Sequence, residues 1–353
     1  MRRSLGLSIV VLGLVWLLAA CGGGIADVAE DAADAGAADA GAAPSEGTAE
    51  SANAAAAGSA DGETASTGEN AEAAKTLKVT HELGVTTVPI EPNTVVVFDF
   101  GTLDTLDQLG VEVKGVPQAN LPAYLEKYKD AKYENVGSLM EPDFEKIAAL
   151  EPDLIVISGR QREAYAELSK LGPTVYLGVD ADRYMESYRE NATTIGKLFR
   201  KEAEVEAELA KVEAQVAALR ETASASGNTA LVVLANEGNI SAYGPGSRFG
   251  IVHDVFGLKA ADEQIEVSTH GMSVTFEYIL EKNPDYLFVV DRGAAVADGQ
   301  PTSQALIENE LVMQTDAYKS GHIVYLNPDY WYLSGGGLVS VAEMAKEIAE
   351  GIE

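Results

Sequence analysis

A segment that occurs twice constrains the fold of this chain more than any other feature. The first copy spans Phe144–Arg160 and the second spans Phe276–Arg292, so every matched position is offset by 132 residues. Both copies read Phe-Glu, an isoleucine two residues later, then Pro-Asp, an apolar run and a final arginine. Such a repeat predicts two similar lobes, each presenting one arginine in an equivalent place. Two facing lobes with a cation on each describe a protein that binds an anion.

The first copy has the pattern of a helix followed by a buried strand. Pro142, with acidic residues on either side, is typical of a first helical turn, and Pro152 ends the helix. The uninterrupted apolar run 154–157 predicts a parallel strand buried on both faces. Open parallel sheets bind ligands beyond the carboxyl ends of their strands, which is where Arg160 and Arg292 are expected. The alternative is that both are ordinary surface arginines.

The N-terminus is typical of an export signal. Two arginines precede a short apolar stretch, and residues 18–22, Leu-Ala-Ala-Cys-Gly, resemble the lipobox of bacterial lipoproteins, whose cysteine becomes lipid-modified. We therefore predict a signal peptide over 1–20 and a lipidated Cys21, with a membrane-spanning anchor as the alternative. Residues 21–75 have no basic residue before Lys75 and are rich in Ala, Gly, Asp, Glu, Ser and Thr. This composition predicts a disordered acidic tether.

Composition excludes several classes of protein. The formal net charge of -30 argues against nucleic acid as a partner. Cys21 is the only cysteine, so the exported domain relies on its core and not on disulfides. The rest of the chain is long enough for two lobes. We assign 76–182 to an N-terminal lobe, 183–223 to a linking helix and 224–353 to a C-terminal lobe.

Helix and strand patterns alternate along the folded part, which predicts an α/β protein with mainly parallel central sheets. A short edge hairpin is expected over 77–89. Apolar residues at spacings of three and four predict one amphipathic helix over 183–222, on the order of 55 Å long. We interpret this helix as a rigid strut that joins the lobes. A coiled-coil oligomerisation helix is the alternative.

The lipobox, the acidic tether, the two lobes and the single connecting helix together resemble the helical-backbone, or class III, substrate-binding proteins of ABC transporters. Within that class, the folded region is similar to the iron–siderophore receptors of the petrobactin and enterobactin type. The segments that carry the likeness are Ser158–Gln161, Gly246–Gly250, Thr269–Gly271, Val290–Arg292 and Tyr330–Gly337. Each is weak alone, but in this order and spacing they are fairly specific.

The resemblance implies that three arginines surround an anionic ferric–catecholate complex, and these correspond to Arg160, Arg248 and Arg292. Guanidinium stays charged, and its forked donors match paired oxygens such as those of a catecholate. Arg248 lies in a loop that glycine and proline would shape, and its alternative is a surface arginine in a turn. No intrinsic cofactor is expected, because Fe(III) arrives as part of the siderophore complex.

The resemblance also implies a histidine and a tyrosine that coordinate iron directly when the siderophore supplies only four oxygens. Ferric iron is six-coordinate, so an imidazole and a phenolate can fill the two open positions. His270, in a loop, corresponds to the histidine. The tyrosine is Tyr332 or Tyr330, because residues two apart share a face of an extended segment. We favour Tyr332, with Trp331 facing the opposite way into packing.

Further partners follow from the same resemblance. Glu145 and Glu277 occupy equivalent places at the start of each lobe's helix and correspond to the glutamates that dock on a dimeric permease; the alternative is a favourable charge at a helix N-terminus. The expected partners are therefore a ferric siderophore, the ABC permease with its ATPase, and the membrane through the lipid anchor. We expect a monomer on the extracytoplasmic side.

Other functions remain as alternatives at this point. Haem or cobalamin could replace the siderophore in the same class, although three arginines exceed the two propionates of haem. Bare zinc or manganese would need about three His or carboxylate ligands together, and the four histidines are scattered. The sequence contains no nucleophile elbow, no Cys–His pair and no P-loop, which argues against an enzyme. A surface lipoprotein without a transport role is the last alternative.

Overall fold

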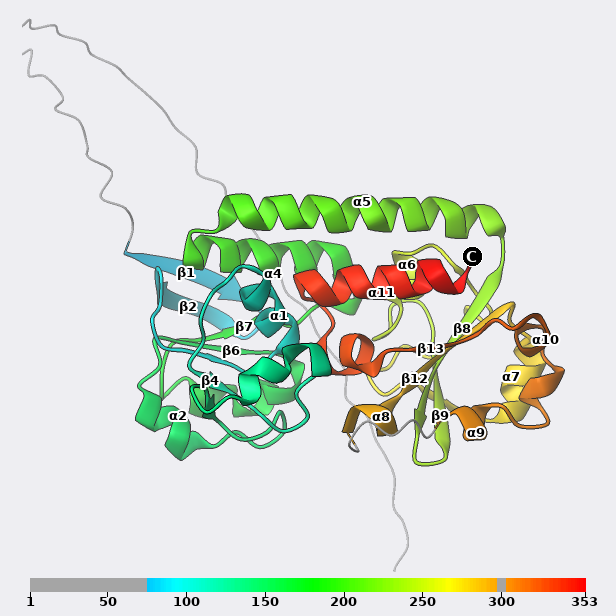
Figure 1. The fold of residues 1–353 in the computed structure, drawn as a ribbon, viewed down its shortest axis with the longest axis horizontal. Helices are drawn as coiled ribbons and strands as arrows, with labels where there is room; N and C mark the ends of the chain where they lie inside the picture. The colour runs from blue at the N-terminus through cyan, green and yellow to red at the C-terminus, as the bar shows by residue number, and fades with distance from the viewer. Residues whose placement is uncertain (1–74, 297–302) are drawn as a thin grey trace, which may run out of the picture. The chain divides into compact units, whose positions relative to one another are not determined.

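The computed structural model describes residues 75–296 and 303–353, which belong to one compact unit (Figure 1). The predicted signal peptide, the lipidated Cys21 and the tether up to residue 74 lie outside the described residues. None of the helices in the described part is both long and apolar enough to cross a membrane.

The first sheet has five strands, all paired in parallel, in the order β5-β4-β3-β6-β7. These strands are β3 Val95–Val97, β4 Gly115–Val116, β5 Glu134–Asn135, β6 Leu154–Ile157 and β7 Thr174–Tyr176. The middle strands β3 and β6 are buried along their whole length, as their uninterrupted apolar sequences predict. The predicted edge hairpin is confirmed as β1 Thr76–His81 paired antiparallel with β2 Gly84–Pro89.

The second sheet is mixed. Its main path runs β11-β9-β8-β12-β13, with β10 also paired to β8. Strands β10, β8, β12 and β13 run parallel, whereas β9 and β11 are antiparallel to their neighbours. The strands are β8 Thr229–Asn236, β9 Asn239–Tyr243, β10 Lys259–Ala260, β11 Met272–Val274, β12 Tyr286–Asp291 and β13 Ile323–Leu326.

Short helices connect the strands of both sheets. In the first half they are α1 Phe100–Gln108, α2 Phe144–Leu150 and α3 Tyr165–Leu168, with 3-10 helices η1 Ala123–Lys129, η2 Gly159–Ala164 and η3 Ala181–Arg183. In the second half they are α6 Ile251–Asp254, α7 Phe276–Lys282, α8 Arg292–Val296, α9 Ser303–Ile307 and α10 Asp316–Ser320, with turns η4 Val312–Gln314 and η5 Asp329–Ser334, and the terminal α11 Leu338–Gly351.

The sequence repeat forms one local structure twice. The helices α2 and α7 begin at a capping side chain, Asp143 and Thr275 respectively, and both end at a residue with left-handed backbone. The Asp of each Pro-Asp pair then binds backbone N–H at the start of the neighbouring strand: Asp153 accepts from Thr94, and Asp285 accepts from Thr229. Much of the repeat therefore serves to dock a helix and a strand onto each sheet.

The predicted linking helix is two helices. α4 spans Tyr184–Phe199 and α5 spans Glu202–Ser226, and Arg200 between them has left-handed backbone (φ 53°). The two helices pack against each other, and at Gly196 a Cβ atom would lie 3.1 Å from Val205, so glycine permits the close approach. Arg189 of α4 also forms a two-pronged ion pair with Glu213 of α5. The strut is therefore α5 alone, about 38 Å long.

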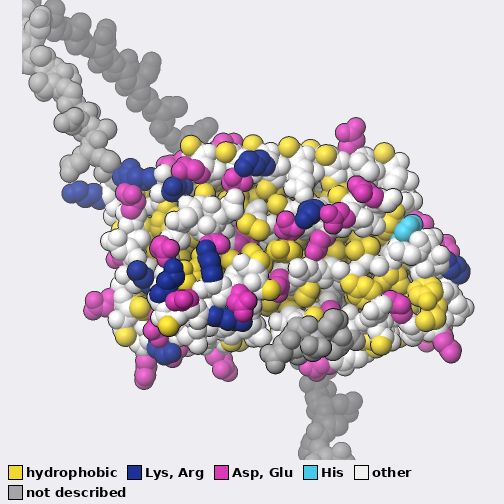
Figure 2. Space-filling model, in the orientation of Figure 1, with side chains coloured by type: hydrophobic (Ala, Val, Ile, Leu, Met, Phe, Trp, Pro, Cys, Tyr) yellow, Lys and Arg dark blue, Asp and Glu magenta, His cyan; other side chains and the backbone are white. Residues whose placement is uncertain are grey.

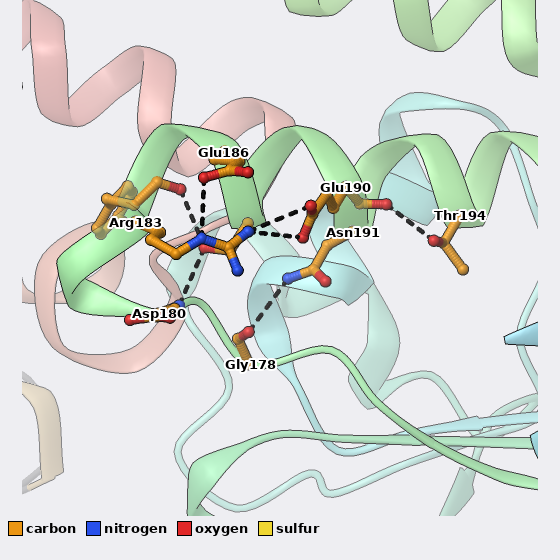
Figure 3. A network of polar contacts seen from close by, with 9 residues as sticks. Gly178, Asp180, Arg183, Glu186, Glu190, Asn191 and Thr194 are labelled. Carbon is orange, nitrogen blue, oxygen red and sulfur yellow. Dashed lines mark hydrogen bonds and ion pairs between the residues drawn. The ribbon is translucent and has the colours of Figure 1, made fainter. Parts of the chain in front are cut away.

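The start of α4 is fixed by local polar contacts (Figure 3). Arg183 donates to Glu186 and Glu190 one and two turns into the helix. Asn191 donates to the carbonyl oxygens of Leu177 and Gly178, which follow β7. These bonds hold α4 against the first sheet, so α4 belongs to the N-terminal half and not to the connection.

One hydrophobic cluster runs through both halves of the molecule. It contains residues of β3 and β6, of α4, α5 and α11, and of β8 and β12. The terminal helix α11 packs on α1 and on α5, and Asp104 of α1 accepts hydrogen bonds from the N–H groups of Val339 and Ser340 at its start. The end of the chain therefore lies at the junction of the halves, whereas we had assigned it to the C-terminal lobe.

Candidate functional site

Three arginines converge on Tyr332. Nη2 of Arg160 and Nη2 of Arg248 donate to the carbonyl oxygen of Tyr332, at 2.6 and 2.7 Å. Nε of Arg292 donates to the phenolic oxygen of the same residue at 2.9 Å. The three guanidinium carbons lie 5.6, 4.4 and 6.0 Å from the centre of the Tyr332 ring, in the order Arg160, Arg248, Arg292. Three positively charged side chains thus surround one residue, Tyr332.

The fold explains how the arginines reach this place. Arg160 lies in η2, directly after β6, and Arg292 begins α8, directly after β12. Both therefore lie beyond the carboxyl ends of parallel strands, as the repeat predicts. Arg248 lies in the loop that leads into α6, where Gly246 has a positive φ of 70°. Tyr332 comes from η5, the turn that follows β13 and leads to α11.

Each of the three arginines has N–H donors that the described contacts leave unused. A guanidinium carries five N–H donors, and only one or two donors of each arginine are used in the contacts with Tyr332, Leu333 and Asn236. Burial lowers the pKa of Arg160, and the positive charge of Arg248 lowers it further. The guanidinium groups therefore keep N–H donors for an anion that accepts several hydrogen bonds, and such an anion would relieve the repulsion between Arg160 and Arg248.

The same positive charges lower the pKa of the Tyr332 phenol. Burial alone would raise the pKa of Tyr332, but the hydrogen bond from Arg292 and the charges of Arg248, Arg292 and Arg160 outweigh it and lower the pKa below its usual value. Deprotonation to phenolate, the form that coordinates a hard cation, is therefore easier here than in water.

Among the described residues, no hydrogen bond or cation–ring contact joins Tyr330 to the three arginines. Its ring packs against Tyr124 with centroids 4.9 Å apart, and burial together with Glu343 and Glu347 raises its pKa. Our reason for keeping both tyrosines, a shared face of an extended segment, is wrong because η5 is a π-helical turn, in which residues two apart point to different sides. Trp331 is buried, as expected, and its indole N–H donates to Glu347.

His270 is not joined to this cluster. It is exposed in the loop between β10 and β11, where its backbone N–H donates to Ser268. Within the described part of the chain, no hydrogen bond, ion pair or ring contact links its imidazole to the arginines or to Tyr332. The next residue, Gly271, does approach the region, because a Cβ atom there would lie 2.7 Å from the ring of Tyr243. His270 as an iron ligand stays a prediction.

Glu145 and Glu277 are both exposed, and each is the second residue of its helix, α2 or α7. The N–H of Glu277 itself and the side chain of Thr275 lower the pKa of Glu277, so it is ionised at neutral pH. The two carboxylates therefore stand in equivalent places on two equivalent helices, as the repeat predicts.

Asn236 is a site residue that the sequence did not reveal to us. It ends β8 beside β12, and its side-chain oxygen accepts from Nη1 of Arg292 at 2.8 Å. Together with the phenol of Tyr332 it fixes the guanidinium from two sides. A polar residue at the carboxyl end of the strand next to β12 is the signal that could have identified it.

Two surface hollows lie elsewhere. One, of about 580 Å³, is lined by Glu112, Glu126, Lys127, Lys129, Asp130, Lys132 and Tyr133, and its lysines are paired with carboxylates. Figure 2 likewise shows acidic side chains beside the lysines and arginines of the drawn face. The other, of about 490 Å³, lies along α4, α5 and α6. Neither contains the converging arginines.

Two α/β halves joined by a long helix are the architecture of the helical-backbone class of substrate-binding proteins. The chain belongs to the periplasmic binding protein family, whose model matches residues 95–330. Its fold class and its place among siderophore-binding class III proteins are therefore as predicted. Family members of this kind are binding proteins and not enzymes, which is what we expected.

Known relatives cover most of the chain. Petrobactin-binding protein YclQ of Bacillus subtilis is 53% identical over 281 residues, covering 78% of this chain and 88% of the relative; its crystal structure gives a TM-score of 0.77, covering 79% of this chain and 99% of that one. Ferric-anguibactin-binding protein FatB of Vibrio anguillarum is 33% identical over 78% of this chain and 87% of its own. The catecholate-siderophore binding protein VctP of Vibrio cholerae is 39% identical with a TM-score of 0.75, covering 77% and 99%.

Proposed function

We propose that this protein is the membrane-anchored substrate-binding component of an ABC importer and binds a ferric siderophore of the catecholate type. The observation that carries the proposal is the convergence of Arg160, Arg248 and Arg292 on one phenol and one carbonyl oxygen. In a chain with a net charge of -30, such a concentration of positive charge is suited to an anionic ligand. Three relatives support this substrate class, because they are binding proteins for petrobactin, ferric anguibactin and a catecholate siderophore.

The three arginines recognise the negative charge of the chelate. Each guanidinium can present two parallel N–H donors to a pair of catecholate oxygens. Asn236 holds Arg292 in place, so less conformational freedom is lost when the ligand binds. When the siderophore supplies four oxygens, the phenolate of Tyr332 and the imidazole of His270 complete the coordination of Fe(III). His270 reaches this position by a movement of its exposed loop.

The remaining parts of the chain deliver the complex. The lipid on Cys21 and the acidic tether keep the folded unit at the extracytoplasmic face of the membrane. Glu145 and Glu277 then dock on arginines of the permease dimer. Uptake of the iron complex by cells carrying Glu145→Arg together with Glu277→Arg tests this step: transport should fall although the purified variant binds the chelate as tightly as before. Normal transport by the double variant would contradict the docking role.

The proposed ligand class is tested by titration of the purified protein. Trp331 is the only tryptophan after Cys21 and lies next to Tyr332, so quenching of its fluorescence reports binding at this site. The ferric complex of a synthetic bis-catecholamide should quench it with submicromolar affinity and give a new absorption band. Haem and cobalamin, titrated in parallel, should bind far more weakly. Tighter binding of either would replace the siderophore as the ligand.

A further inference from the structure

Tyr243 is a buried tyrosine whose hydroxyl has no partner. It ends β9, its side chain is 1% exposed, and no hydrogen bond to its oxygen is found within the described residues. A buried polar atom left in this state destabilises a fold, because it loses its hydrogen bonds to water and gains none in return. Phenylalanine would fill the same space without that cost, so packing alone does not explain why this residue carries a hydroxyl.

The surroundings of Tyr243 belong to the arginine cluster. Its ring packs against Phe249, with centroids 4.6 Å apart, and the guanidinium carbon of Arg248 lies 5.2 Å from the centre of the same Phe249 ring. The charge of Arg248 and the phenol of Tyr332 both act on the Tyr243 hydroxyl. The unpartnered oxygen therefore lies in the electrostatic field of the binding site.

The loop that carries His270 rests on the same ring. Gly271 has a φ of +73°, and a Cβ atom at that residue would lie 2.7 Å from the Cε2 and Cζ atoms of Tyr243. Only glycine allows the backbone to lie this close to the ring carbon that bears the hydroxyl. The glycine of the Thr-His-Gly segment is thereby explained, and Tyr243 lies between the His270 loop and the arginine-bearing loop.

We propose that the hydroxyl of Tyr243 is a further ligand-binding group. When the His270 loop moves towards the chelate, Gly271 leaves the Tyr243 ring, and the uncovered hydroxyl donates a hydrogen bond to an anionic oxygen of the chelate held by the three arginines. This inference rests on the proposed function. Burial raises the pKa of Tyr243, so its hydroxyl keeps its proton and acts as a donor. The oxygen that is unsatisfied without ligand becomes satisfied with it, so the same group opposes folding and favours binding.

Tyr188 provides a matched control. It is 0% exposed, and its hydroxyl is likewise without a partner in the described part of the chain. It lies in α4, where burial and the charges of Asp104, Glu213 and Glu208 act on its hydroxyl. Removal of the Tyr188 hydroxyl should therefore have the same effect on stability and no effect on binding.

The test compares Tyr243→Phe and Tyr188→Phe by thermal unfolding and by titration with the ferric complex of a synthetic tetradentate bis-catecholamide. Both variants should unfold at a higher temperature than the wild type without ligand. Only Tyr243→Phe should bind the complex more weakly, by about tenfold, as for one hydrogen bond to a charged group. Unchanged affinity of Tyr243→Phe, or equal losses in both variants, would overturn the assignment. A wild type that does not bind the complex would instead refute the proposed function.

Discussion

Replacement of Tyr332 by phenylalanine separates its contact with Arg292 from its proposed role as an iron ligand. The change removes the phenolic oxygen and therefore the 2.9 Å bond from Arg292. The carbonyl oxygen that accepts from Arg160 and Arg248 stays, and so does the ring that the guanidinium groups surround. Since Arg292 keeps its bond to Asn236, the ligand-free protein should lose only about 1 kcal/mol of stability, the contribution of one hydrogen bond.

The effect on binding should depend on the number of donors in the siderophore. In the proposed function a tetradentate ferric complex takes the phenolate as an iron ligand. Loss of a group that merely supports a metal ligand already weakens binding about 10–100-fold. Tyr332→Phe should therefore lower affinity for such a complex by more than about a hundredfold. A hexadentate siderophore fills all coordination positions of the iron, so its complex binds through the arginines alone. Its affinity should therefore fall by less than about tenfold.

Fluorescence of Trp331 measures both affinities, and the absorption band of the iron complex reports on coordination. In the wild type, coordination releases the phenolic proton, so affinity for the tetradentate complex should rise with pH up to the pKa of Tyr332, which the arginines lower. This pH dependence should disappear in Tyr332→Phe. The double variant with His270→Ala should lose the remaining selectivity. Equal losses for the two kinds of complex, with an unaltered absorption band, would show that these side chains only line the site.

Three further predictions concern charge, pH and rigidity. Arg160→Ala should weaken binding of a ferric catecholate by about 1–3 kcal/mol in the same titration, while Arg248 keeps the Tyr332 carbonyl satisfied; an unchanged affinity would contradict the argument from the repeat. Burial raises the pKa of Asp104 to about 7. Above about pH 4 the folded protein therefore holds a proton that the unfolded chain releases, and the free energy of unfolding falls as the pH rises. Urea unfolding should show a decrease of about 2–3 kcal/mol from pH 5 to pH 7. Asp104→Asn should abolish that part of the slope, and parallel slopes would refute it. Small-angle scattering should give nearly the same radius of gyration with and without ligand, because one core cluster passes through α5 and α11; a large decrease on binding would contradict the strut.

The sequence predicted those parts of the fold that depend on local pattern. The repeat revealed α2, β6, α7 and β12, because helix caps, Pro-Asp pairs and apolar runs are encoded by neighbouring residues. It also located Arg160 and Arg292, since strand ends have fixed positions in a parallel sheet. The break between α4 and α5 was missed because Arg200, which has no special preference for left-handed backbone, is held there by the packing of Gly196 on Val205.

The site itself was only partly predictable. Arg248 and Tyr332 were found through the family resemblance, because no local pattern distinguishes them from other loop residues. Asn236 was missed, since it acts through a contact with Arg292, a distant part of the chain. The contacts of Tyr243 with the loop at Gly271, and of Asp104 with the start of α11, were missed for the same reason. Such contacts arise only after the sheets and helices have packed, and a single sequence does not display them.

The carbonyl oxygen of Tyr332 has a consequence for how receptors of this kind diverge. Arg160 and Arg248, from different halves of the molecule, share a main-chain atom that is present whatever side chain occupies position 332. In the proposed function, a substitution at this position therefore changes the metal-coordinating group and keeps the arrangement of the two guanidinium groups. Recognition of charge and coordination of iron can then evolve independently of one another.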